Sequence, residues 1–152
     1  MSFQVRDGQI KKYRRSGAMD PTVEVVVPAG EFLKPTGVVN EYGLIDETSC
    51  PVVFLNLTNS DRPDCVDGGL ALIGGASYEL ATDHFDATAT FLPEAAITVK
   101  GGSIAGTDNV SGVIAVASSG DYIHGWVKEA PAAANDNKLV VIMSATNDGE
   151  VV

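Results

Sequence analysis

Short apolar runs, each ended by glycine, proline, asparagine or aspartate, recur at a spacing of roughly 8–12 residues along most of this sequence. Valine and threonine favour strands because a side chain branched at Cβ fits a pleated sheet, whereas glycine fits the turns between strands. The chain contains 16 glycines and 7 prolines among its 152 residues. The pattern predicts an all-β fold, a small β-sandwich or barrel of about nine short strands with an extended N-terminal arm.

The strongest single strand prediction is residues 51–57, which are apolar enough to be buried on both faces of a sheet. Residues 78–85 are ambiguous, because Tyr78, Ala81 and Phe85 have the spacing of one helix face and are compatible with a short helix. The other expected strands are 22–27, an irregular strand within 38–45, and 70–73, 88–92, 97–99, 113–116, 122–127 and 139–143.

The charge distribution suggests how the chain is organised. The net charge is −10, yet residues 1–15 carry five basic side chains and one acidic side chain, whereas the rest carry five basic and nineteen acidic ones. We therefore expect a basic N-terminal arm at 1–20, a β-rich domain at 21–146 and an acidic tail at 147–152. The arm either binds an acidic surface or is a solvated terminus. Its basic residues are Arg6, Lys11, Lys12, Arg14 and Arg15.

Composition also argues against several kinds of partner. A strongly acidic body repels phosphate groups, so no nucleic-acid binding is expected of the folded domain. No apolar run approaches the ~18 residues that span a bilayer, and the first residues lack the apolar segment of a signal peptide. We therefore expect no membrane partner, and synthesis and assembly in a cytoplasm.

Two cysteines, Cys50 and Cys65, lie in neighbouring loop-like stretches. Neither belongs to a Cys-x-x-Cys pair or has a histidine at ligand spacing, so a zinc site is not expected. In a reducing compartment both would be free thiols. A disulfide formed after release from the cell is the alternative, and it would close a loop worth roughly 3 kcal/mol if the geometry permits.

An aromatic segment offers one candidate binding face. In an extended strand, Tyr122, His124 and Trp126 would share one side, since alternate residues point the same way. Such a face can bind a ligand, form a protein–protein interface, or pack in the core.

Nothing in the sequence matches catalytic machinery. Residues 75–79 lack the final glycine of a nucleophile elbow, and the chain has no phosphate-binding Gly-Lys-Ser/Thr loop. His84 lies near Asp83 and Asp86, but successive residues of a strand point to opposite faces, so we expect a structural histidine. We therefore expect no catalytic residues, no metal site, no cofactor and no enzymatic activity.

The last third of the chain carries a resemblance. Its parts are a Gly-Asp-Tyr-Ile-x-Gly segment at 120–125, a Lys-Glu-Ala exit at 128–130, a loop rich in alanine and asparagine, and a closing Leu-Val-Val-Ile-Met run at 139–143. This pattern resembles the end of small capsid decoration (cement) proteins of tailed bacteriophages. The resemblance implies a β-rich structural protein of the virion, made in the host bacterial cytoplasm.

On this resemblance, the partner would be the major capsid protein, and the chain would act as a homotrimer that clamps the outer capsid surface with its basic arm. A carbohydrate- or receptor-binding module of a head fibre or tail structure is the alternative. The face formed by Tyr122, His124 and Trp126 motivates that second hypothesis.

Overall fold

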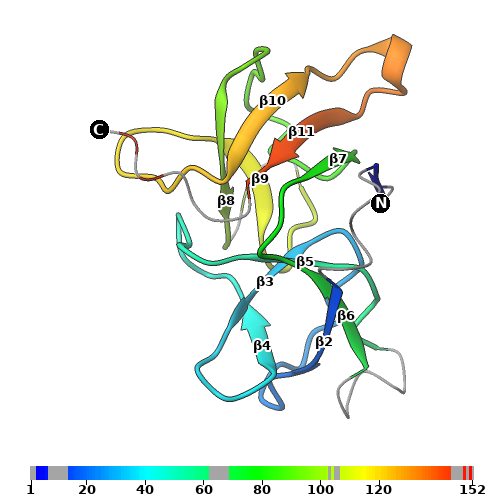
Figure 1. Cartoon of the computed structure of the whole chain (residues 1–152), viewed down its shortest axis with the longest axis vertical. Coiled ribbons are helices and arrows are strands. Elements are labelled where there is room, and N and C mark those ends of the chain that lie inside the picture. Colours follow the sequence, from blue (N-terminus) through cyan, green and yellow to red (C-terminus); the bar gives the residue numbers. More distant parts are fainter. Residues whose placement is uncertain are drawn as a thin grey trace.

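The computed structural model describes residues 3–6, 14–61, 69–102, 104, 107–144, 149 and 151. Within these residues it contains eleven strands, one 3₁₀ turn at Ala133–Asn135 and no α-helix. The strands form two sheets, which occupy the two halves of the molecule in Figure 1. The predicted all-β class is therefore confirmed. Among the described residues there is no helix long and apolar enough to cross a membrane.

The lower half in Figure 1 is a closed five-stranded barrel with the order β2-β4-β3-β5-β6. Only the β2–β4 pair is parallel, and it joins the two ends of an otherwise antiparallel sheet. Closure leaves no strand of the barrel with an unpaired edge. The barrel strands are β2 (Arg14–Met19), β3 (Phe32–Pro35), β4 (Glu41–Leu44), β5 (Phe54–Asn56) and β6 (Leu70–Ile73).

The upper half is an antiparallel six-stranded sheet with the order β1-β7-β11-β10-β8-β9. Its first strand comes from the start of the chain, and its other five come from the part that follows the barrel (Figure 1). The strands are β1 (Phe3–Val5), β7 (Tyr78–Thr82), β8 (Ala96–Lys100), β9 (Val113–Val116), β10 (Gly125–Glu129) and β11 (Leu139–Met143).

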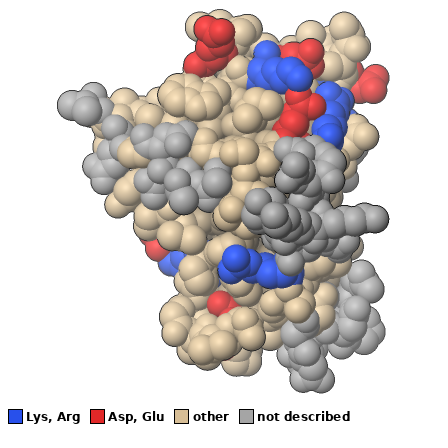
Figure 2. All heavy atoms as spheres, viewed as in Figure 1, with Lys and Arg blue, Asp and Glu red and all other residues tan. Residues whose placement is uncertain are grey.

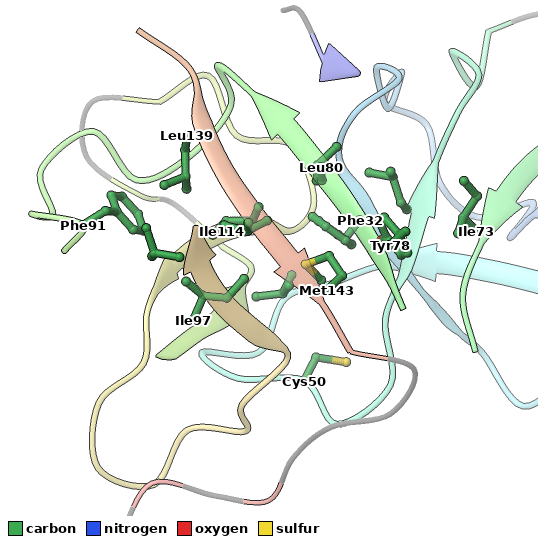
Figure 3. Packing of buried hydrophobic residues seen from close by; sticks show 14 of the residues in the cluster. Phe32, Cys50, Ile73, Tyr78, Leu80, Phe91, Ile97, Ile114, Leu139 and Met143 are labelled. Carbon is green, nitrogen blue, oxygen red and sulfur yellow. The ribbon is translucent and has the colours of Figure 1, made fainter. Parts of the chain in front are cut away.

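The larger hydrophobic core joins the two halves. Alternate residues of the sheet, including Ile97, Ile114 and Leu139, gather on one face (Figure 3). They belong to the same cluster as Phe32 and Leu55, which come from barrel strands. Each such fully buried side chain contributes about 1.5–3 kcal/mol relative to exposure, so the barrel and the sheet stabilise each other. A smaller cluster within the barrel comprises Val27, Leu33, Tyr42, Phe54, Leu70 and Leu72.

Backbone contacts also fix the junction between the halves. Phe32 and Gly112 exchange two backbone hydrogen bonds of 3.0 and 3.2 Å. Nearby, the amide of Gly101 donates to the carbonyl of Glu47 at 2.9 Å. A Cβ on Gly101 would lie 1.9 Å from the carbonyl oxygen of Ile45, so only glycine permits this approach.

Several strand predictions are wrong. Residues 22–27 form no strand, and Val25 and Val26 are about half exposed, at 52% and 49%. Prolines flank this segment, and Val27 exchanges hydrogen bonds with Ser60 instead of joining a sheet.

Residues 88–92 also form no strand. The side chain of Asp86 accepts hydrogen bonds from the amide and hydroxyl of Thr88, which favours a turn.

Residues 78–85 contain a strand rather than a helix. Strand β7 takes up residues 78–82 and pairs on its two sides with β1 and β11. The helical spacing of its apolar residues is thus overridden by backbone pairing to distant strands.

The predicted boundary of the N-terminal arm is wrong as well. Residues 3–5 form β1 of the sheet, and residues 14–19 form β2 of the barrel, so the folded domain begins before residue 21. Lys11 and Lys12 lie outside the described residues. In the tail, the backbone at Gly149 and Val151 makes three hydrogen bonds to the 120–123 segment. The described residues of the tail are therefore joined by hydrogen bonds to the sheet half, and the tail boundary itself stays a prediction.

Candidate interaction surface

An exposed apolar pair lies on the outer face of the six-stranded sheet. On β10, Gly125 and Val127 are buried, whereas Trp126 between them is 42% exposed. Trp126 lies directly opposite Ile142 of β11, which is 38% exposed. The pair therefore presents an aromatic ring and a branched aliphatic side chain side by side, held by the backbone register of adjacent strands.

Charged side chains border this pair. Glu79 of β7 lies opposite Ile142, and its carboxylate accepts a hydrogen bond from Nζ of Lys128, two residues after Trp126. Nη1 of Arg6 lies 3.9 Å from Oε2 of Glu79. Figure 2 shows acidic and basic side chains close together over this half of the molecule. We call Arg6, Glu79, Trp126, Lys128 and Ile142 the sheet patch.

Tyr122, His124 and Trp126 do not form the single exposed face that the sequence suggested. His124 is 4% exposed, and its Nε2–H donates to the carbonyl of Cys50 at 2.5 Å. Tyr122 is partly buried, and its amide donates to Oγ of Ser49. The reason is that strand β10 begins at Gly125. The alternation of side chains between the two faces of a strand therefore does not extend back to His124. Of the three, Trp126 alone belongs to the exposed sheet patch.

The predicted basic cluster is divided between the two halves. Arg6 lies at the edge of the sheet patch, whereas Arg14 and Arg15 belong to β2 of the barrel. Lys11 and Lys12 lie outside the described residues. The described basic residues therefore cannot act together as one flexible arm.

Cys50 is a buried thiol, 3% exposed, whose Sγ–H donates to the carbonyl of Val52 at 3.3 Å. Cys65 lies outside the described residues, so the disulfide between them stays a prediction. The intact mass of the protein under non-reducing conditions tests it, because a bond removes two hydrogens.

Burial of Cys50 and Tyr78 predicts that the fold is less stable in alkali. Burial raises the pKa of both groups in the folded protein, whereas in the unfolded chain they ionise near about 8.5 and 10. A group whose pKa is higher in the folded protein than in the unfolded chain stabilises the fold. This contribution is complete at a pH below the pKa of the unfolded chain, and it is lost as the pH rises toward the pKa of the folded protein. Urea denaturation between pH 8 and pH 11 should show the free energy of unfolding falling.

The substitution Tyr78→Phe should reduce the loss of stability that occurs above about pH 10. The substitution Cys50→Ala should reduce the loss of stability that begins at about pH 8.5. If both variants lose stability with pH as steeply as the wild type, burial of these two groups is not the cause.

The structure contains a buried polar contact between Glu31 and His84 that the sequence did not reveal. Glu31 is fully buried, and its two carboxylate oxygens accept hydrogen bonds from the amides of Val110 and Ser111, at 3.0 and 2.9 Å. Nε2 of His84 lies 3.0 Å from Oε1 of Glu31, without the alignment of a good hydrogen bond. Glu31 and His84 lie 53 positions apart in the sequence, so no local pattern connects them. The expected structural role of His84 agrees with this contact.

In the part of the chain that the structure describes, no three His, Cys, Asp or Glu side chains converge to hold a metal ion. The six-stranded sheet presents an exposed aromatic side chain, Trp126, on its outer face, and such a side chain suits contact with another surface.

Comparison with known proteins identifies no relative of this chain. No protein family matches the chain, and neither a curated protein nor a solved structure matches it.

Proposed function

We propose that this protein is a structural component of a bacteriophage virion that binds the outer capsid surface and stabilises the shell. The observation that carries the proposal is the exposed Trp126–Ile142 pair, which lies on the outer face of the six-stranded sheet and is bordered by charged groups. Large aromatic side chains surrounded by a polar rim are typical of the energetically dominant residues of protein interfaces. The resemblance of the last third of the chain to decoration proteins supplies the identity of the partner.

The proposed action is mechanical rather than chemical. A protein that binds only the assembled shell stabilises it by mass action, because detachment of a capsid subunit must also break the new contacts. A rigid sheet is suited to this task, since little conformational freedom is lost when its side chains meet a partner. On a symmetric shell, a homotrimer would bring three sheet patches to neighbouring major capsid proteins.

Arg6 extends the same surface. Its contact with Glu79 is partly exposed, and such ion pairs contribute only about 0–1 kcal/mol. Arg6 can therefore exchange Glu79 for an acidic group of the capsid at little cost. In the proposal Arg6 replaces the predicted arm as the basic contact to the shell.

The test is sedimentation of the protein with purified capsids. Trp126→Ala should weaken binding about thirtyfold, since truncating a dominant interface residue costs about 2 kcal/mol or more. Val39→Ala is the matched control, because Val39 is an 87% exposed valine in the barrel half, away from the patch. Equal binding by wild type and Trp126→Ala would contradict the assignment of the patch.

A mass-spectrometric census of purified virions tests the function itself. A copy number in a fixed ratio to the shell protein is expected. Affinity for glycans combined with absence from capsids would instead support the carbohydrate-binding alternative, for which Trp126 provides an exposed aromatic surface.

A further inference from the structure

A small pocket opens where one end of the barrel meets the six-stranded sheet. Its volume is about 220 Å³, and its lining includes Arg15 and Phe54 from the barrel and Tyr78 and Met143 from the sheet. Tyr78 and Met143 lie on adjacent, paired strands, and Figure 3 shows both in the core region between the halves. The pocket is separate from the sheet patch, since none of its lining residues belongs to that patch.

The lining of this pocket includes a cation, the guanidinium of Arg15. The guanidinium of Arg15 lies 4.7 Å from the centre of the Phe54 ring, over a side chain that is only 8% exposed. The chain has 20 acidic and 10 basic residues, yet Arg15 forms no ion pair with any carboxylate that the structure describes. Its N–H groups, which suit bidentate contact with a carboxylate, are therefore available to a ligand.

The wall of the pocket carries a second polar group without a partner. Tyr78 is 4% exposed and lines the pocket, but its hydroxyl makes no hydrogen bond to another described residue. Burial raises the pKa of Tyr78, so the phenol remains protonated at neutral pH and can donate. A ligand in the pocket that accepts a hydrogen bond from this hydroxyl would gain a directional contact from the wall.

The size and the other walls limit what the pocket can hold. At ~30 Å³ per water molecule, its volume corresponds to about seven waters, and it is smaller than the ~300 Å³ at which pockets begin to hold drug-sized ligands. Phe54, Val53 and Met143 supply apolar walls. The pocket therefore suits a compact apolar group of the size of a benzene ring or a short alkyl chain.

We propose that this pocket binds a small monocarboxylate with an apolar body, with the carboxylate at Arg15, the apolar body between Phe54 and Met143, and Tyr78 as a second hydrogen-bond donor. The same chemistry occurs in a free aromatic or aliphatic acid and at the C-terminus of a protein that ends in an apolar residue. The inference is independent of the proposed binding to capsids.

The test is an NMR titration of the full-length protein with benzoate, hexanoate and N-acetylphenylalanine. At least one should bind with a Kd of about 1 mM or lower, and its uncharged amide should bind at least about tenfold more weakly. Binding of benzoate or hexanoate would indicate a free acid as the natural source, whereas binding of N-acetylphenylalanine alone would indicate a peptide C-terminus. If none of the three binds the wild type, the proposal is overturned.

Substitutions test the individual contacts. Arg15→Gln should weaken binding of the carboxylate at least about tenfold and leave the amide unchanged, whereas Lys128→Gln, an equal change of charge on the sheet patch, should have no effect. Tyr78→Phe, which removes only an unpaired hydroxyl, should fold normally and bind several-fold more weakly. Wild-type affinity in Arg15→Gln would overturn the site, and wild-type affinity in Tyr78→Phe would overturn the role given to its hydroxyl.

Discussion

Deletion of residues 1–19 is expected to abolish cooperative folding. The deletion removes β2, whose parallel pairing with β4 and antiparallel pairing with β6 close the barrel. Without it, β4 and β6 each lose one of their two partner strands, and the buried residues Leu70 and Leu72 lose the strand that pairs with them. Circular dichroism and urea denaturation should show a loss of the cooperative transition.

A shorter deletion serves as the control. Removing residues 1–6 takes away β1, a three-residue strand at the edge of the sheet, and leaves the barrel intact. This variant should retain a cooperative transition with a moderately lower midpoint. If the deletion of residues 1–19 instead melts within a few degrees of the wild type, β2 does not support the barrel and the segment behaves as the arm that the sequence suggested.

Glu31→Gln is expected to lower the free energy of unfolding by about 3 kcal/mol, because a buried backbone N–H loses the carboxylate oxygen that accepts its hydrogen bond. The new amide can accept from only one of the two backbone N–H groups that the carboxylate serves, and its own NH₂ group then faces the other. For a chain of this length, thermal denaturation should show a midpoint lower by roughly 10 °C.

Two further variants separate the role of Glu31 from a general effect of charge. Glu24→Gln removes the same charge from an exposed position and should change stability by less than about 0.5 kcal/mol. A double-mutant cycle with His84→Gln should give a coupling energy of about 1–3 kcal/mol between Glu31 and His84. A coupling near zero would mean that the backbone amides alone account for the effect of Glu31.

Sequence patterns located the strands that are continuous apolar runs bounded by turn residues. Residues 70–73, 113–116 and 139–143 were predicted with the bounds that the structure has, because each run is buried and rich in leucine, isoleucine or valine. The valine-rich run at 22–27 is also predicted as a strand but forms none, because strand formation depends on a partner strand as well as on propensity.

Strand β2 could not be predicted, because Arg-Arg-Ser-Gly-Ala-Met has no apolar alternation. It is a strand because β4 and β6 supply its backbone partners, and these lie far along the chain.

The candidate site was predictable only in part. Trp126 was identified from its aromatic neighbourhood, but Ile142 and Glu79 join it through strand register, which the sequence does not display. The contact between Glu31 and His84 is equally non-local, and so is the meeting of Arg15 with Tyr78 in one pocket. In each case the partners come from different strands or loops, and only the pairing of the two sheets brings them together.

The order of the strands along the chain has a consequence for synthesis of the protein. All five barrel strands lie between residues 14 and 73, so the barrel can close as soon as that stretch has left the ribosome. Strand β1 is made before any of them, yet its partner β7 begins only at Tyr78. Strand β1 must therefore wait until the barrel segment is complete before it can pair with β7, and its backbone groups are open to wrong pairing during that interval.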